Sequence, residues 1–153
     1  MMKCQSRSLF PLIRTSKKKL DRRIEENKIL HAAIQQCQAR DQSAVINGRR
    51  LNNMCLACFF KIETPSGDTI SQQATEYNHA IPRSRLVGKR FWTDLHSPRN
   101  LVGACREHHH AYDRRPELWL LLLHLAFGYD YSDSPFAYYL DKGREEWLTK
   151  IKM

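Results

Sequence analysis

Four residues in the middle of the chain have the types and spacing of metal ligands. Cys55 and Cys58 are separated by two residues, so a tight turn can direct both thiolates at one ion. Cys105 and His108 repeat the same separation further along the chain. A structural zinc needs four such ligands in a closed tetrahedral arrangement. The two motifs together predict one structural Zn²⁺ held by Cys55, Cys58, Cys105 and His108, with metal binding coupled to folding.

Three consecutive histidines, His108 to His110, cannot all face this ion, because neighbouring residues of a helix point about 100° apart. If His108 completes the zinc site, His109 must point elsewhere. Asp113 follows His109 by one helical turn and shares its face. His109 and Asp113 could therefore share a second metal ion, while we interpret His110 as an exposed residue.

A polar pair, Asn78-His79, interrupts an extended stretch that ends at Pro82. A single histidine in such a place is usually structural. Beside a second metal site, however, a neutral imidazole near pH 7 can act as a general base. His79 is therefore a candidate for that role.

The segments that carry these residues resemble the HNH endonuclease family in its zinc-supported form, of the kind found in phages. The resemblance rests on Asn78-His-Ala-Ile-Pro-Arg-Ser-Arg85 and on Asn100-Leu-Val-Gly-Ala-Cys-Arg-Glu-His-His109, with the Cys55-x-x-Cys58 pair upstream. It covers about residues 53–115. Two positions depart from the family pattern: the second zinc pair is CxxH instead of CxxC, and Asn78 stands where Asp or His is commoner.

The resemblance implies a ββα-metal unit, in which two antiparallel strands and a helix surround one divalent ion such as Mg²⁺ or Mn²⁺. His79 would take a proton from water, and the hydroxide would attack a DNA phosphorus in line. Asn78, His109 and Asp113 would hold the catalytic metal, which stabilises the leaving 3′ oxygen. Asn100 would brace the loop between the strands and keep His79 oriented. The implied products carry 5′-phosphate and 3′-hydroxyl ends.

These motifs need a scaffold, and the sequence predicts an α+β fold in three parts. Residues 1–52 form a basic arm and helix, residues 53–115 form a small zinc-stabilised ββα-metal core, and residues 116–153 form a helical extension. Hydrophobic periodicity and capping signals predict four helices. They run from Lys17, after a cap at Thr15 or Ser16, to about Gln38, over Arg106–Arg114, over Glu117–Phe127 and from about Ser134 or Phe136 to the C-terminus. Extended segments are predicted at Thr75–Ile81 and Asn100–Ala104, and a hairpin joins Phe59–Ile62 to Thr69–Gln72 around Pro65–Asp68.

Positive charge is concentrated in two parts of the chain. Of its 153 residues, 25 are Lys or Arg and 16 are Asp or Glu, which gives a net charge of +9. Residues 1–53 carry 12 basic and 4 acidic side chains, and residues 79–115 carry 8 and 3. This asymmetry favours a polyanion such as DNA as the partner. The candidate phosphate contacts are Lys17, Lys18, Lys19, Arg83, Arg85, Lys89, Arg90 and Arg99.

Several classes of protein are excluded or disfavoured by composition. The longest apolar stretch, Leu118–Phe127, is about half of the ~20 residues that a membrane-spanning helix needs. Five cysteines without an export signal do not indicate a disulfide framework. We therefore expect no membrane partner and a cytoplasmic location, in a bacterial host cell if the chain is phage-encoded.

Two other classes of function stay open. A non-catalytic zinc module that binds nucleic acid would need the cysteines and the basic segments, but not Asn78, His79 and His109. An assembly role, for instance in phage packaging with a phage or host protein as partner, is the second. Among nucleases, the residues do not separate recombination, branched-DNA processing, packaging, defence and homing enzymes. The apolar helix around Trp119 fits either a core or a dimer face, so the oligomeric state is open too.

Overall fold

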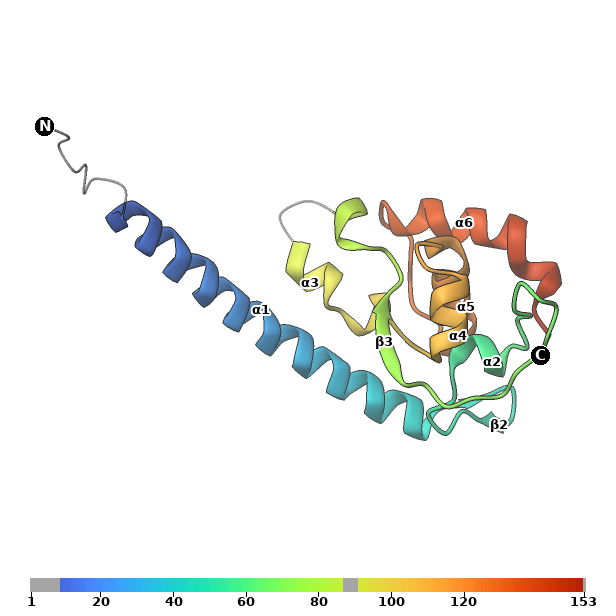
Figure 1. The fold of residues 1–153 in the computed structure, drawn as a ribbon. Coiled ribbons are helices and arrows are strands. Elements are labelled where there is room, and N and C mark those ends of the chain that lie inside the picture. The colour runs from blue at the N-terminus through green and yellow to red at the C-terminus, as the bar shows by residue number, and fades with distance from the viewer. Residues whose placement is uncertain (1–8, 87–90, 153) are drawn as a thin grey trace, which may run out of the picture.

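The computed structural model of the protein describes residues 9–86 and 91–152, apart from the side chains of residues 9–15 and 91. It combines helices with two small antiparallel sheets, so the predicted α+β class is confirmed. One long helix, α1, projects from a body formed by the other elements (Figure 1). Within the described residues, no helix has both the length and the apolar character needed to cross a membrane.

Helix α1 (Leu9–Ser43) has 35 residues and is about 52 Å long. Residues 16–25 are exposed, whereas Ala33 and Cys37 are buried against Leu101 of the body. The helix therefore begins earlier and ends later than the sequence predicted. Pro11 is accommodated because it lies in the first turn, where backbone N–H groups have no intrahelical partner.

A small hairpin connects α1 to the first cysteine pair. Its strands are β1 (Val45–Ile46) and β2 (Arg49–Arg50), and its turn is Asn47-Gly48. Both turn residues have positive φ, 51° and 78°, which matches the right-handed twist of a two-residue hairpin.

The hairpin predicted around Pro65–Asp68 is wrong. The residues expected to form its first strand begin instead with the end of helix α2 (Leu56–Phe59), a single turn that follows Cys55. This helical turn brings Cys55 and Cys58 to the same side, which an extended strand would not do. The segment from residue 60 to residue 75 consists of turns and loops with one isolated bridge, from Met54 to Gln73.

The central sheet has two antiparallel strands, β3 (Glu76–His79) and β4 (Leu101–Ala104). Their connection contains three short helical segments: η1 (Arg83–Arg85), α3 (Phe91–Leu95) and η2 (Pro98–Asn100). Helix α4 (Arg106–Ala111) follows β4 directly. The extended segments and the first helix of the predicted core are therefore present in the order strand, strand, helix.

The two faces of this hairpin meet different helices. Successive side chains of a strand point to opposite faces, so Glu76 shares a face with Asn78, and Tyr77 shares the other with His79. Glu76 contacts α4 through His109, whereas the Tyr77 hydroxyl donates to Asp41 of α1. The hairpin therefore lies between α4 and α1.

The C-terminal end of α1 is fastened to the body through Arg40. Its guanidinium donates to the carbonyl oxygens of Pro98 at 2.7 Å and Leu101 at 3.1 Å. It also forms an ion pair of 2.8 Å with the buried Asp41. These directional contacts fix the path of α1 relative to η2 and β4.

Helices α5 (Pro116–Phe127) and α6 (Phe136–Trp147) pack against each other and complete the core, followed by η3 (Leu148–Lys150). Leu118 to Leu123 are at most 1% exposed, so this apolar helix belongs to the core and does not offer a dimer face. The two helices cross closely at Gly143, where an added Cβ would lie 2.1 Å from the carbonyl oxygen of Glu117.

Candidate metal centre and catalytic residues

The four predicted zinc ligands come together in the structure. Their ligand atoms all lie within 4.8 Å of one another, and all four residues are buried. The Cys58 and Cys105 sulfurs are 3.8 Å apart, and His108 Nδ1 lies 3.3 Å from each of them. A tetrahedral ion with bonds of about 2.3 Å to sulfur separates two sulfurs by roughly 3.8 Å. Cys55, Cys58, Cys105 and His108 could therefore hold a metal ion, and the donor set is consistent with zinc.

Local structure explains why these side chains converge. Cys55 and Cys105 each occupy the position before a helix, α2 and α4, so the next ligand returns one turn later. His108 Nε2 lies 2.7 Å from the Ile62 carbonyl oxygen. Because a carbonyl can only accept, Nε2 carries the proton and Nδ1 presents its lone pair to the cysteines.

The surroundings of the cysteines determine how their protonation is coupled to metal binding. The hydrogen bond with Cys58, together with burial, raises the pKa of Cys55 to about 12, and burial raises the pKa of Cys105 to about 11. Both thiols are therefore protonated near pH 7 without a cation. Binding of a divalent ion would release those protons, so metal affinity should increase with pH.

His79 lies on the other face of the hairpin, in a line of hydrogen-bonded side chains. His79 Nε2 is 3.0 Å from His96 Nδ1, and His96 Nε2 is 2.9 Å from Glu26 Oε1 on α1. We call these three residues the His–His–Glu triad. Burial, with the nearby positive charge of Arg83, lowers the pKa of His79 to about 4. Its imidazole is therefore neutral near pH 7.

Sequence reasoning missed two members of this triad, His96 and Glu26. His96 lies in the basic connection between the strands, where no spacing marks it. Glu26 lies on a helix whose charges were interpreted as a DNA contact. One signal was present: Glu26 shares a helical stripe with Leu30, Ala33 and Cys37, and these side chains face the body.

Asn100 is fully buried and braces the connection between β3 and β4. Its Oδ1 accepts from the Ile81 N–H at 2.8 Å, and its Nδ2 donates to the carbonyls of Ile81 and Leu95, each at 3.1 Å. Ile81 follows shortly after His79, so Asn100 holds the backbone at the end of β3. The resemblance implied such a bracing role for Asn100, and its effect on catalysis stays a prediction.

The side chains predicted to hold a catalytic metal share the α4 face but do not converge. His109 Nδ1 lies 2.8 Å from Glu76 Oε1, and its Nε2 lies 3.9 Å from Asp113 Oδ1, so the two carboxylates are at opposite sides of the ring. Asn78 Oδ1 is buried and has no hydrogen-bond partner among the described residues. An amide oxygen without a donor, an imidazole and carboxylates are donor types that suit a hard divalent ion. Glu76 was not predicted as a member of this set.

The structure therefore distributes the predicted catalytic residues over two faces. His79 turns toward α1, whereas Asn78 and His109 belong to the α4 face. In residues 9–86 and 91–152, the Cys/His cluster is the one group of three or more Cys, His, Asp or Glu side chains whose ligand atoms gather together.

The predicted DNA contacts have different surroundings. Lys17, Lys18 and Lys19 are on the exposed part of α1. Arg83 and Arg85 lie in η1, where Arg83 pairs with Glu26 and Arg85 is exposed. Lys89 and Arg90, which the sequence also predicted as phosphate contacts, lie outside the described residues.

The guanidinium of Arg99 is engaged by acidic and aromatic side chains of the body. It lies 2.8 Å from Asp133 and 3.5 Å from Asp94, and its guanidinium is 4.0 Å from the centre of the Phe136 ring. These contacts give Arg99 a structural role in joining η2 to the C-terminal helices. We therefore do not include it in the proposed DNA interface.

A groove of about 560 Å³ lies between α1 and α3. It is lined by Ser16, Lys19, Leu20, Arg22, Arg23, Glu26 and Trp92. Three of these side chains are basic, and Glu26 also belongs to the His–His–Glu triad. The groove therefore connects the basic face of α1 with the surroundings of His79.

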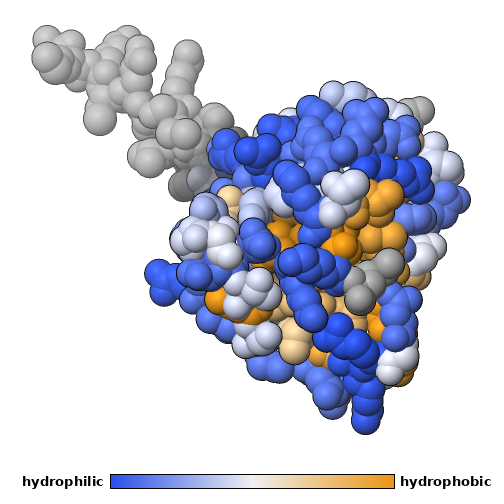
Figure 2. Space-filling view, turned by 90° about the vertical axis from the view of Figure 1, so that its right-hand side faces the viewer, coloured by the Kyte–Doolittle hydropathy of each residue, from blue (hydrophilic) through white to orange (hydrophobic). Residues whose placement is uncertain are grey.

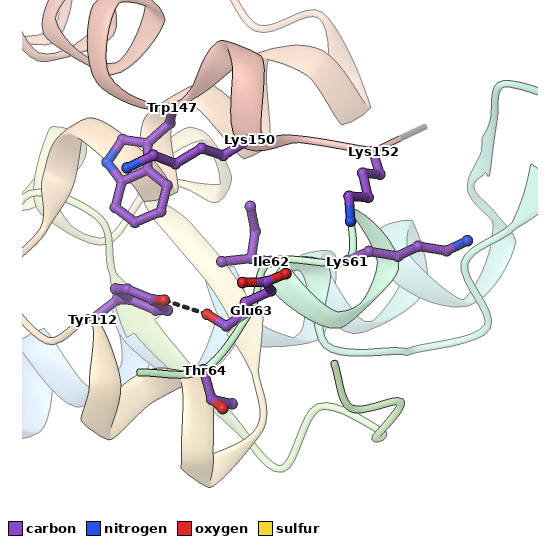
Figure 3. A pocket seen from close by; sticks show the side chains of 8 residues that line it. All are labelled: Lys61, Ile62, Glu63, Thr64, Tyr112, Trp147, Lys150 and Lys152. Carbon is purple, nitrogen blue, oxygen red and sulfur yellow. Dashed lines mark hydrogen bonds between the residues drawn. The ribbon is translucent and has the colours of Figure 1, made fainter. Parts of the chain in front are cut away.

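A second pocket, of about 330 Å³, lies near the C-terminus of the chain (Figure 3). Lys61, Lys150 and Lys152 surround it together with Tyr112 and Trp147. Figure 2 shows this side of the molecule as a hydrophobic area framed by hydrophilic side chains. None of the predicted catalytic residues lines the pocket, so we do not assign the proposed chemistry to it.

Comparisons with known proteins do not assign the chain to a family: no protein family, no curated protein and no solved structure matches it. The case for a function therefore depends on the residues and their geometry.

Proposed function

We propose that the protein is a metal-dependent endonuclease of the HNH type that hydrolyses phosphodiester bonds in DNA. The observation that carries this proposal is His79, a neutral imidazole held in a fixed orientation at the end of β3. The order of β3, β4 and α4, with a Cys/His cluster at the start of α4, supports the same conclusion. The basic groove beside Glu26 supports a polyanionic substrate.

His79 acts as the general base in this proposal. One ring nitrogen is engaged by His96, and the other accepts a proton from water. The hydroxide forms a bond to phosphorus while the bond to the 3′ oxygen breaks, and the 3′ oxygen then takes a proton from solvent. The products carry 5′-phosphate and 3′-hydroxyl ends.

The α4 face contributes the charge stabilisation. Asn78, His109 and a carboxylate from Glu76 or Asp113 would hold a divalent ion, which supplies Lewis-acid stabilisation of the charge on the phosphate. The orphaned Asn78 oxygen is the feature that supports this assignment. We assign zinc to the separate Cys/His cluster, where Cys55, Cys58, Cys105 and His108 would hold it and so would fix the helix that carries His109.

DNA would approach along the basic side of α1. Lys17, Lys18 and Lys19 are exposed there, and the groove between α1 and α3 adds Arg22 and Arg23. Basic side chains of this kind bind phosphates without reading sequence. Trp92 at the groove gives an aromatic surface on which an unpaired base could stack.

A second candidate is a zinc module that binds nucleic acid without cleaving it. The observation that favours it is that His79 faces one side of the β3–β4 hairpin, whereas Asn78 and His109 lie on the other side. In that case the triad and the α4 face are structural contacts, and the basic groove alone has a function.

A cleavage assay distinguishes the two candidates. Duplex, nicked, branched and single-stranded DNA would each be incubated with the protein and Mg²⁺ or Mn²⁺. We expect cleavage that falls by about 10²- to 10⁴-fold in His79→Gln, with unchanged metal content and DNA affinity. His110→Gln is the matched control, because His110 is exposed on α4. If the protein binds DNA but does not cleave it with either metal ion, the non-catalytic zinc module is favoured.

A further inference from the structure

We infer that helix α1 is part of the catalytic centre, because Glu26 on α1 and His96 are positioning residues that determine which nitrogen of His79 accepts the proton. The inference rests on the proposed role of His79 as a general base. It assigns to α1 a task besides binding DNA.

The order of protons along the triad follows from what each group can donate. A carboxylate only accepts, so the contact of 2.9 Å between Glu26 and His96 requires a proton on His96 Nε2. In neutral His96 the other nitrogen, Nδ1, must then be an acceptor. His79 Nε2 therefore donates across the contact of 3.0 Å, and His79 Nδ1 is left with the lone pair.

The ionisation of Glu26 supports this order. Burial acts to raise the pKa of Glu26, but hydrogen bonds from His96 and Arg83, together with the positive charge of Arg83, lower it overall. Arg83 adds an ion pair to the same carboxylate. Glu26 therefore behaves as a fixed acceptor at neutral pH, and it sets the direction of both hydrogen bonds.

The positions of the three residues allow Glu26 to determine the direction of the hydrogen bonds in the triad. The His96 side chain is only 2% exposed and that of Glu26 17%, so little water competes for their hydrogen bond. His96 follows α3, His79 ends β3, and Glu26 lies on α1. Without Glu26, His96 could turn its N–H toward His79, which would place a proton on the nitrogen that must accept one.

A purely structural rival has Glu26 fasten α1 to the body. In that case removal of Glu26 would loosen the helix but would not change the tautomer of His79. The rival predicts weaker DNA binding or lower stability, with kcat unchanged.

The test compares Glu26→Ala with Glu25→Ala, an exposed neighbour on the same helix with the same loss of charge. We expect Glu26→Ala to lower kcat by about 10- to 100-fold with little change in KM. In protein with ¹⁵N-labelled histidine, the wild type should show His79 protonated on Nε2, and Glu26→Ala should show a mixture of tautomers. Glu25→Ala should match the wild type in both measurements.

A conservative variant guards against loosening of α1. Glu26→Gln keeps an oxygen that can accept from His96, and it should retain most of the rate and the His79 tautomer. The inference would be overturned by a wild-type His79 protonated on Nδ1, or by an unchanged tautomer and kcat in Glu26→Ala. If the wild type cleaves no DNA, the proposed function fails, while the tautomer measurement still tests the hydrogen-bond order.

Discussion

The Cys/His cluster and the His–His–Glu triad lie on different sides of the same hairpin and are built in different ways. The cluster draws four buried side chains toward one point, from two short segments. The triad arranges three side chains in a line, from three segments that are far apart in the chain. Four protein ligands around one ion leave no coordination position for a substrate, so the cluster suits an ion that stabilises the fold. In the linear triad, His96 engages only one ring nitrogen of His79, so the other nitrogen is available to accept a proton.

This difference predicts opposite responses to mutation. Loss of one cluster ligand should destroy an entire metal site and the fold that depends on it. Loss of a triad member should change a reaction rate or a hydrogen bond while most of the structure persists. The following experiments test that contrast, in order of decreasing effect.

The largest effect is expected from Cys58→Ser in the cluster. A structural ion is coupled to folding, so its loss should lower the melting temperature by about 10 °C or more. Metal analysis after dialysis and thermal unfolding would measure the two changes together. Cys37→Ser is the matched control, since Cys37 is also fully buried but lies on the body-facing side of α1, outside the cluster. If the Cys58→Ser protein retains one ion and its melting temperature, the cluster does not bind a structural ion.

Asn100→Ala should have the next largest effect, because the side-chain amide forms hydrogen bonds with three backbone groups. Its removal leaves the Ile81 N–H and the carbonyls of Ile81 and Leu95 without their partner in the core. We expect a loss of about 2–3 kcal/mol in the free energy of unfolding, measured with urea. The metal content should not change. Asn27→Ala on the exposed side of α1 serves as a control and should be nearly neutral.

A smaller, salt-dependent effect is expected from replacing Lys17, Lys18 and Lys19 by Gln. If each contacts a phosphate, the slope of log affinity against log salt should fall by about two to three units. The control replaces three exposed lysines elsewhere, Lys142, Lys150 and Lys152. An equal change of slope in both proteins would mean that only net charge matters.

The smallest effect concerns the pH dependence of stability at Glu26. Its pKa is lower in the folded protein than the ordinary value of 4.5, so the unfolded chain binds more protons as the pH falls. The stabilising contribution is therefore present above about pH 4.5 and lost below it. Glu26→Gln should remove this contribution, which we expect to be under 1 kcal/mol, or about the value of a surface ion pair. Urea unfolding of both proteins between pH 3.5 and 6.5, at about half-unit steps, would measure it. A difference in the free energy of unfolding that does not change with pH would contradict an ionised Glu26 in the folded protein.

The two regions also differ in how far the sequence predicted them. The CxxC and CxxH spacings report local geometry, because a helical turn after Cys55 and after Cys105 is enough to pair the ligands. The helices α4, α5 and α6 were predicted for the same reason, from periodicity and from Gly128 and Pro116 at their ends. The metal cluster was therefore accessible from neighbouring residues alone.

The triad could not be predicted in this way, because it depends on where α1 crosses the hairpin. That crossing is determined by Arg40 and by the packing of Cys37 on Leu101, and neither contact has a sequence motif. The hairpin predicted around Pro65–Asp68 failed for a related reason. Its turn residues are genuine turn formers, but the residues before them are needed as a helical turn between two ligands.

If DNA binds along α1 as proposed, the length of the helix limits the length of duplex that it can cover. About 52 Å of helix corresponds to roughly 15 base pairs of duplex, or one and a half turns, at 3.4 Å per base pair. Residues 16–25 of α1 are exposed, whereas Ala33 and Cys37 pack against the body, so the N-terminal half of the helix extends beyond the body (Figure 1). A duplex lying along α1 would therefore be protected asymmetrically, with a longer footprint on one side of the cut than on the other.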